Sequence, residues 1–325
     1  MDISDLILDV QDLRVHFPVF GGIIPRKKAV VHAVDGVSFT LGKGETIGLV
    51  GESGCGKTTV GRAIVNILSA MNYRVDISGR AFYHHESGIV DLLALRRKRM
   101  RSYRSDLQMV FQDPYSSLNP RMTVGRIIEE PLTIHTKLVQ AERQERIHWL
   151  LSKVGLSSEH AGRYPHEFSG GQRQRVGIAR ALATNPKIIV ADEPVSALDV
   201  SIQAQVINLM QDLQEELGLS YIFIAHDLSV VRHISDRIFV MYLGKIVESG
   251  PAEEIYRHPL HPYSKLLLSA LPRPNPTVRR ERGSGLRGDL PSPLNKPSGC
   301  AFRTRCSIAR PSCAEETPPL EFRDG

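Results

Sequence analysis

The sequence predicts an α/β protein with a parallel sheet, an antiparallel β subdomain, an inserted helical subdomain and an irregular C-terminal extension. The first supporting observation is a glycine-rich loop, residues 51–58, between a short apolar run and a helical segment. The second is a pair of continuous apolar runs, residues 188–191 and 221–225, typical of parallel strands covered on both faces. The third is a change in composition near residue 260, which marks the extension.

The N-terminal part of the chain predicts the β subdomain and the first strand of the parallel sheet. Residues 6–17 and 33–39 alternate apolar and polar side chains, as antiparallel strands do. Between them we expect an irregular insert, residues 18–28, because it is rich in glycine, proline and basic residues. Residues 46–50 predict a short apolar strand that leads into the glycine-rich loop, and residues 58–68 predict the helix after it.

The middle of the chain predicts a helical subdomain, residues 113–185, inserted into the α/β core. Three segments predict helices: 123–134, 141–154 and 172–184. The last of these must end before Pro186, whose ring prevents the helix from continuing. Residues 202–217 then predict the crossover helix that joins two parallel strands.

We place a domain boundary at about residue 260, with residues 1–260 as the main domain. Nine of the 20 prolines lie from Pro272 to Pro319, and three of the four cysteines lie in the same part of the chain. Residues 261–325 therefore predict an extension with little regular structure.

The composition is that of a soluble globular protein, with 42% hydrophobic and 23% charged residues. No run approaches the roughly 18 apolar residues that a membrane helix needs. The N-terminus is acidic and lacks the basic-then-apolar order of a secretory signal. We therefore expect a cytoplasmic protein whose cysteines are thiols or metal ligands rather than disulfides.

The net charge of +6 mildly favours an anionic partner. The densest basic cluster, residues 96–101, is interpreted first as a solvated helical face, and contact with lipid headgroups or a membrane subunit is the alternative. Nucleic acid is not an expected partner, because no aromatic side chains interleave with these charges.

The glycine-rich loop fits the pattern G-x-x-x-x-G-K-[ST], which cradles nucleotide phosphates. The loop consists of Gly51, Glu52, Ser53, Gly54, Cys55, Gly56, Lys57 and Thr58, and Thr59 follows it. Its glycines allow backbone N–H groups to approach a β-phosphate, and the helix after it adds its positive end. Lys57 is expected to contact the β- and γ-phosphates of ATP, and Thr58 to offer its hydroxyl to Mg²⁺.

Two adjacent acidic residues follow the apolar run 188–191. Asp192 lies at the predicted end of the strand, where its carboxylate is expected in the Mg²⁺ shell. Glu193 comes next and is the predicted general base that polarises the attacking water. Together with the phosphate loop, this pair predicts ATP hydrolysis.

A further loop at the start of the predicted helix 172–184 resembles the signature loop of ABC transporter ATP-binding subunits. Its residues are Ser169, Gly170, Gly171 and Gln172. The resemblance implies a P-loop NTPase core of ABC type, in which this loop binds the γ-phosphate held by an opposite subunit. ATP would then lie between two such chains and join them.

The same resemblance implies the roles of several further residues. Gln112 would contact Mg²⁺ or the attacking water, and the surrounding region would dock onto a permease. His226, after the run 221–225, would sense the γ-phosphate, and Asp199 would belong to the loop that links the two sites. An aromatic residue would stack on adenine. Phe17 lies nearest the expected place, with Phe20 and His32 as alternatives.

Two segments, residues 163–168 and 258–263, are similar to those of the dipeptide and oligopeptide importer ATPases. This closer resemblance implies a peripheral protein at the cytoplasmic face of the inner membrane. The implied partners are a related ATPase, two transmembrane permeases and an extracytoplasmic solute-binding protein. Members of this family usually pair two different ATPases. One carries Gly-Gly-Met in its signature loop and the other carries Gly-Gly-Gln. The alternatives are another small solute, such as an opine, or a soluble ABC ATPase of translation or DNA repair.

The three tail cysteines, Cys300, Cys306 and Cys313, also match this family, whose tail can hold a [4Fe–4S] cluster. Such a cluster normally needs four ligands, and the remaining cysteine, Cys55, lies inside the phosphate loop. A cluster completed by another ligand, a zinc site and three reduced thiols are the alternatives.

Overall fold

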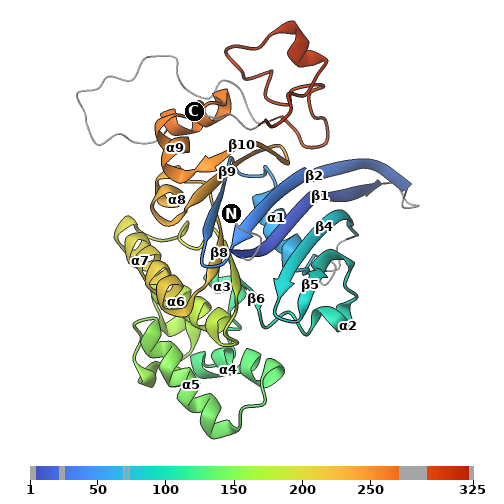
Figure 1. Ribbon diagram of the computed structural model, residues 1–325. Coiled ribbons are helices and arrows are strands. Elements are labelled where there is room, and N and C mark those ends of the chain that lie inside the picture. Colours follow the sequence, from blue (N-terminus) through green and yellow to red (C-terminus); the bar gives the residue numbers. More distant parts are fainter. Residues whose placement is uncertain (1–4, 22–25, 69–70, 72–73, 271–290, 322–325) are drawn as a thin grey trace, which may run out of the picture. The chain divides into compact units, whose positions relative to one another are not determined.

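The computed structural model describes residues 5–21, 26–68, 71, 74–270 and 291–321 (Figure 1). The chain forms two compact units, each of which is described by itself. The first unit contains Met1–Asp5, Gly42–Thr46 and Leu95–Ile224. The second unit contains Leu6–Leu41, Ile47–Ala94 and Ala225–Gly325.

The first unit contains three parallel strands in the order β8-β7-β6. They are β6 (Leu107–Val110), β7 (Ile188–Asp192) and β8 (Ser220–Ala225). Every residue of β7 and β8 is buried, as continuous apolar runs require. Helix α7 (Val200–Leu217) joins these two strands, which confirms the predicted crossover helix.

Three helices of the first unit agree closely with the predicted segments 123–134, 141–154 and 172–184. They are α4 (Val124–His135), α5 (Gln140–Lys153) and α6 (Gly170–Leu182). The unit also contains the shorter helices α2 (Arg97–Met100), α3 (Pro114–Ser117), η3 (Ser158–Gly162) and η4 (Pro165–Glu167). Apolar side chains between α4, α5 and α6 are buried, among them Ile127, Ile128, Leu150, Leu151 and Val176. In α2 only Met100 is buried, so the basic side chains of this cluster are exposed on the surface of the chain.

The second unit begins with a four-stranded antiparallel sheet of order β2-β1-β4-β5. Its strands are β1 (Leu6–Gly21), β2 (Arg26–Gly42), β4 (Asp76–His85) and β5 (Gly88–Asp91). The prediction of an irregular insert at residues 18–28 was wrong for its described residues. Strand β1 continues to Gly21 and β2 already begins at Arg26, because a hairpin arm that is largely exposed does not need a regular apolar alternation.

The second unit also contains the strand that precedes the glycine-rich loop. This strand, β3 (Thr46–Val50), runs parallel to β9 (Arg237–Tyr242), which pairs antiparallel with β10 (Lys245–Pro251). The helices are α1 (Lys57–Ile64), η2 (Leu92–Ala94), α8 (Leu228–Ile234) and α9 (Ala252–Arg257). The predicted strand 46–50 is confirmed, whereas the helix after the loop ends at Ile64 rather than at residue 68.

The end of the chain contains more regular structure than predicted. Helix α10 (Pro262–Ser269) and the short η5 (Pro311–Ala314) lie within it. Phe302 is buried and its ring lies 5.2 Å from that of Tyr242 and 5.4 Å from that of Tyr263. The high proline content of this region led to a prediction without helix α10. Pro262 lies in the first turn of α10, where proline is compatible with a helix. In the described part of the chain, no helix is long and apolar enough to cross a membrane.

Candidate nucleotide-binding site

The phosphate loop connects β3 to α1 in the second unit, which is the predicted strand–loop–helix arrangement. Lys57 is only 4% exposed, and its Nζ donates to the carbonyl oxygens of Gly51 at 2.7 Å and Glu52 at 3.0 Å. Gly56 has φ of 109°, and a Cβ there would lie 2.2 Å from the carbonyl oxygen of Ala33. The loop is therefore shaped around its lysine, and glycine is required at position 56.

The end of β7 brings two predicted catalytic residues together in the first unit. Asp192 is fully buried, and the amide of Gln112 donates to a carboxylate oxygen of Glu193 at 2.9 Å. Glu193 has φ of 45° and its backbone N–H donates to the carbonyl oxygen of Ile224 at 2.9 Å. A left-handed conformation in a non-glycine residue is costly and is typical of functional sites. Glu193 is therefore held in a defined position.

The signature loop forms the N-terminus of α6 in the first unit. The hydroxyl of Ser169 accepts from the N–H of Gln172 at 3.3 Å, and the side chain of Gln172 accepts from the N–H of Ser169 at 3.0 Å. This capping box satisfies two of the free N–H groups at the helix start. Ser169 is exposed, so the positive end of α6 faces outward and can receive an anion.

The remaining predicted site residues lie at the ends of helices and strands. Thr58 and Thr59 are in the first turn of α1, His226 follows β8 and is exposed, and Asp199 precedes the first residue of α7. Lys57, Thr58 and His226 belong to the second unit, whereas Gln112, Asp192, Glu193, Asp199 and the signature loop belong to the first.

Comparison with known proteins identifies the family of this chain. A family model described as ABC transporter matches residues 34–196, and one described as the C-terminal region of the oligopeptide/dipeptide transporter matches residues 247–313. The oligopeptide transport ATP-binding protein AppF of Bacillus subtilis is 54% identical over 99% of this chain and 94% of that protein. The chain belongs to the ABC transporter family. Within it, the chain is a transport ATPase of the oligopeptide/dipeptide branch.

Other relatives and solved structures agree with this family. The oligopeptide transport protein OppF of Salmonella typhimurium is 54% identical over 97% of this chain and 93% of that protein. The dipeptide transport protein DppF of Escherichia coli is 51% identical over 98% and 92%. The dimeric ATP-binding cassette MJ0796 bound to ADP and Pi has a TM-score of 0.63 at 27% identity, covering 76% of this chain and 99% of that one. The predicted fold class, a P-loop α/β core of ABC type, is confirmed.

Two glycines of α6 in this ABC ATPase, Gly171 in the signature loop and Gly177 further along the helix, differ in their surroundings. A Cβ at Gly171 would lie 2.5 Å from a methyl carbon of Ile202 in α7, whereas a Cβ at Gly177, in the same helix, meets nothing within 4 Å. We expect Gly171→Ala to lower the free energy of unfolding by about 1–3 kcal/mol. Gly177→Ala is the matched control and should raise it by about 0.5–1 kcal/mol, because alanine favours the helix.

Denaturant unfolding of the two variants beside the unchanged ABC ATPase measures this difference. Equal stability of the two variants would show that α6 moves away from α7 without cost.

The predicted adenine-stacking residues of this ABC ATPase lie on or near the first hairpin of the second unit. Phe17 is half-buried in β1, and Phe20 is 40% exposed with the guanidinium of Arg74 at 5.1 Å from its ring centroid. His32 is engaged elsewhere, because its Nδ1 lies 3.1 Å from Nε2 of His16.

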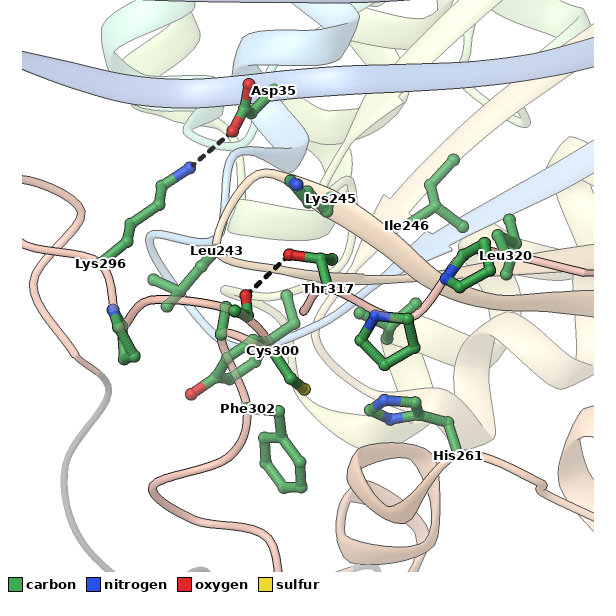
Figure 2. Close-up of a pocket in the computed structure, with 17 residues that line it drawn as sticks. Asp35, Leu243, Lys245, Ile246, His261, Lys296, Cys300, Phe302, Thr317 and Leu320 are labelled. Carbon is green, nitrogen blue, oxygen red and sulfur yellow. Dashed lines mark hydrogen bonds and ion pairs between the residues drawn. The ribbon is translucent and has the colours of Figure 1, made fainter. Parts of the chain in front are cut away.

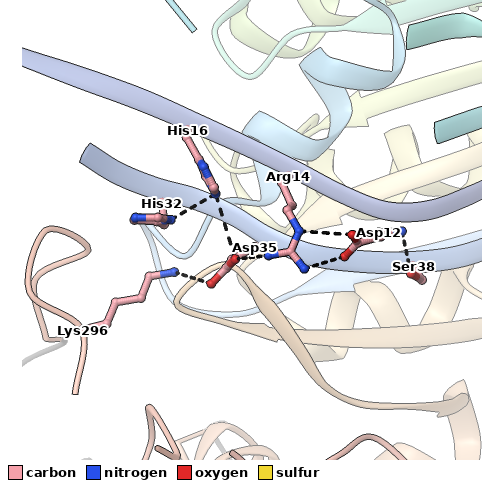
Figure 3. A network of polar contacts seen from close by, with 7 residues as sticks. All are labelled: Asp12, Arg14, His16, His32, Asp35, Ser38 and Lys296. Carbon is pink, nitrogen blue, oxygen red and sulfur yellow. Dashed lines mark hydrogen bonds and ion pairs between the residues drawn. The ribbon is translucent and has the colours of Figure 1, made fainter. Parts of the chain in front are cut away.

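His16 and His32 belong to a polar network in the same sheet (Figure 3). With Asp35 they form a group whose ligand atoms lie within 4.8 Å of one another. Asp35 already faces two cations, since its carboxylate lies 3.1 Å from Arg14 and 3.7 Å from Lys296. Burial and the neighbouring His32 lower the pKa of His16. The charges of Arg14 and Lys296 beside Asp35 are what make this position unfavourable for a metal ion.

The three tail cysteines of this ABC ATPase, Cys300, Cys306 and Cys313, are half-buried. Among the described residues, their sulfur atoms are not grouped within 4.8 Å of one another. The N–H of Cys300 donates to the carbonyl oxygen of Cys313 at 2.8 Å, so the backbone joins two of them. Cys55 is buried in the phosphate loop and is not available as a fourth ligand of a cluster. The cysteines present therefore do not complete the ligand set of a [4Fe–4S] cluster.

We expect native protein to react with three equivalents of a thiol reagent, at Cys300, Cys306 and Cys313. All three are partly exposed, and Cys300 lines a cavity of about 330 Å³ between the tail and β10 (Figure 2). Cys55 should react only after denaturation, because burial raises the pKa of its thiol and shields it.

Thiol titration without and with denaturant counts the reactive thiols in native and in unfolded protein, and we expect three and four. In Cys55→Ser the two counts should be equal. Fewer than three reactive thiols, together with iron and acid-labile sulfide in protein purified without oxygen, would contradict this expectation.

Proposed function

We propose that this chain hydrolyses ATP to power the import of dipeptides or oligopeptides across a membrane. The observation that carries the proposal is the Gln112–Glu193 contact at the end of β7, since it holds a general base in a protein of this family. Peptide cargo is supported by the curated relatives, which are named for oligopeptide or dipeptide transport, and by the family model over residues 247–313.

The proposed division of labour follows from residue chemistry. Lys57 and the loop N–H groups bind the β- and γ-phosphates, and Phe17 stacks on adenine. Oxygen atoms of Thr58, Asp192 and Gln112 are suited to Mg²⁺, a hard cation that neutralises phosphate charge. Glu193 accepts the proton of the attacking water.

The leaving phosphate is contacted by His226 and by a second chain. Ser169, Gly170, Gly171 and Gln172 contribute the N-terminus of α6 to the γ-phosphate of the opposite chain, and Asp199 links the two sites. Support for this arrangement comes from the exposed start of α6 and from the dimeric cassette that this chain resembles.

We further propose that the chain is peripheral at the cytoplasmic face of the membrane and pairs with a related ATPase and two permeases. Tyr115, three residues after Gln112, is 66% exposed, and the Arg173 guanidinium lies 3.7 Å from its ring centroid. This rigid aromatic residue is suited to docking on a permease. We retain residues 1–260 and 261–325 as the proposed domains, with the helical subdomain at 113–185.

The test is purification of the tagged chain from its native membrane in mild detergent. Two permeases, a second ATPase and a peptide-loaded binding protein would support the proposal and identify the cargo. Recovery with ribosomes or DNA, or with a binding protein loaded with another solute, would overturn it.

A further inference from the structure

Arg305 in the tail contacts the phosphate loop directly. Its two terminal nitrogens donate to the two carboxylate oxygens of Glu52 at 2.6 and 2.8 Å. The side chains of Arg305 and Glu52 are only 4% and 19% exposed, so this is not a solvated surface pair. The hydrogen bonds to Glu52 raise the pKa of Arg305, which keeps the guanidinium charged. A shielded, bidentate pair of this kind is both strong and geometrically specific.

Tyr263 provides a second contact from α10 to the same loop residue. Its hydroxyl accepts from the backbone N–H of Glu52 at 2.8 Å. The ring is fully buried and lies 4.7 Å from the ring of Tyr242 and 5.4 Å from that of Phe302. Burial raises the pKa of Tyr263, so it remains a neutral phenol. Its hydroxyl is therefore a fixed acceptor on a packed aromatic cluster.

Glu52 connects these two contacts to the lysine of the loop. Its carboxylate binds Arg305, its N–H binds Tyr263, and its carbonyl oxygen accepts from Nζ of Lys57 at 3.0 Å. Without Arg305, a carboxylate would stand unneutralised beside the phosphates of ATP and would repel them.

We propose that Arg305 and Tyr263 are positioning residues of the phosphate loop, so that the C-terminal extension sets the affinity for nucleotide. The arginine neutralises Glu52 and fixes the direction of its side chain, and the tyrosine fixes its backbone. Neither residue contacts the reacting atoms. The inference rests on the assignment of residues 51–58 as the ATP phosphate loop.

The charge argument makes a specific prediction about two variants and their combination. We expect Arg305→Ala to raise the dissociation constant of Mg-ATP about tenfold, which corresponds to a lost charged hydrogen-bond pair. Glu52→Gln should have a smaller effect because it removes the repelling charge together with the pair. The double variant should resemble Glu52→Gln, since the arginine has no counter-charge left to neutralise.

The measurement is calorimetric titration of the full-length chain with Mg-ATP, with ATP hydrolysis by the assembled transporter as a second readout. The KM for ATP should rise while kcat stays within about twofold, because ground-state and transition-state binding change together. Arg303→Ala is the matched control. Arg303 lies two residues before Arg305, is half-buried and donates to the carbonyl oxygen of Ser298 at 2.9 Å, so its replacement should leave the affinity for Mg-ATP unchanged.

Unchanged affinity in Arg305→Ala, or a double variant with the two losses added together, would overturn the proposal. If Arg305→Ala does not fold, Arg305→Lys and Tyr263→Phe provide the same test. Each should weaken binding by a few-fold, and normal affinity in both would overturn the proposal. An unchanged chain that fails to bind Mg-ATP would overturn the loop assignment itself, which is distinguishable from a failure confined to the variants.

Discussion

Glu193→Gln should reduce the turnover of ATP by about 10²- to 10⁴-fold while leaving ATP binding intact. A carboxylate accepts the proton of the attacking water, and an amide of the same shape does not. The geometry should survive, because an amide oxygen at this position can still accept from Gln112, as the carboxylate does at 2.9 Å. Since hydrolysis would release the two chains, the variant should also accumulate as an ATP-bound dimer.

Two measurements check this expectation. ATP hydrolysis by the assembled transporter gives turnover, and size-exclusion chromatography with Mg-ATP reports the dimer. Glu215→Gln is the matched control, because Glu215 is an exposed acidic residue of α7, and its replacement should leave both readouts unchanged. Undiminished hydrolysis in Glu193→Gln would remove Glu193 as the general base and would leave His226 as the candidate.

Ser169→Arg should reduce hydrolysis by the assembled dimer by about 10²-fold, as the loss of a phosphate-stabilising donor does. The substitution places a long cation at the exposed start of α6 and removes the hydroxyl that accepts from Gln172 at 3.3 Å. The substitution should weaken binding of the γ-phosphate that the opposite chain holds. ATP affinity of the isolated variant should therefore equal that of the unchanged chain.

The comparison requires two assays on the same preparation. Nucleotide titration of the isolated chain tests its own phosphate loop, and hydrolysis by the mixed dimer tests the shared site. Ser169→Asn is the control, because asparagine is also a good N-terminal cap and should keep the helix start intact. Equal loss of nucleotide affinity in the isolated Ser169→Arg chain would contradict a site shared between two chains.

The parts of the fold that carry strong local signals could be predicted from the sequence. The strand 46–50 is confirmed residue for residue, and the helices α4, α5 and α7 lie within two residues of their predicted starts. Their apolar spacing directly reflects which face is buried. The structure brings Gln112 and Glu193, two predicted site residues, into contact although they are 81 positions apart, and their catalytic roles stay predictions.

Other elements carry no such signal. Strands β4 and β5 are largely exposed or half-buried, so their side chains need not alternate clearly. Glycine and proline between residues 18 and 28 led to the prediction of an irregular insert. The strands β1 and β2 nevertheless extend into this segment, because solvent-facing strands tolerate these residues. Arg305 had no local pattern that could indicate its role, because its partner Glu52 is 253 positions away.

The Arg305–Glu52 pair also bears on how this branch of the family can evolve. A chain shortened before α10 would keep its phosphate loop but would lose both the counter-charge of Glu52 and the acceptor of its N–H. The proposed role of these contacts implies that removal of the extension would weaken nucleotide binding even with the cassette core intact. Among relatives, we expect an acidic residue at position 52 to occur together with a basic residue at position 305. Chains without the extension should lack the acidic residue at the second position of the phosphate loop.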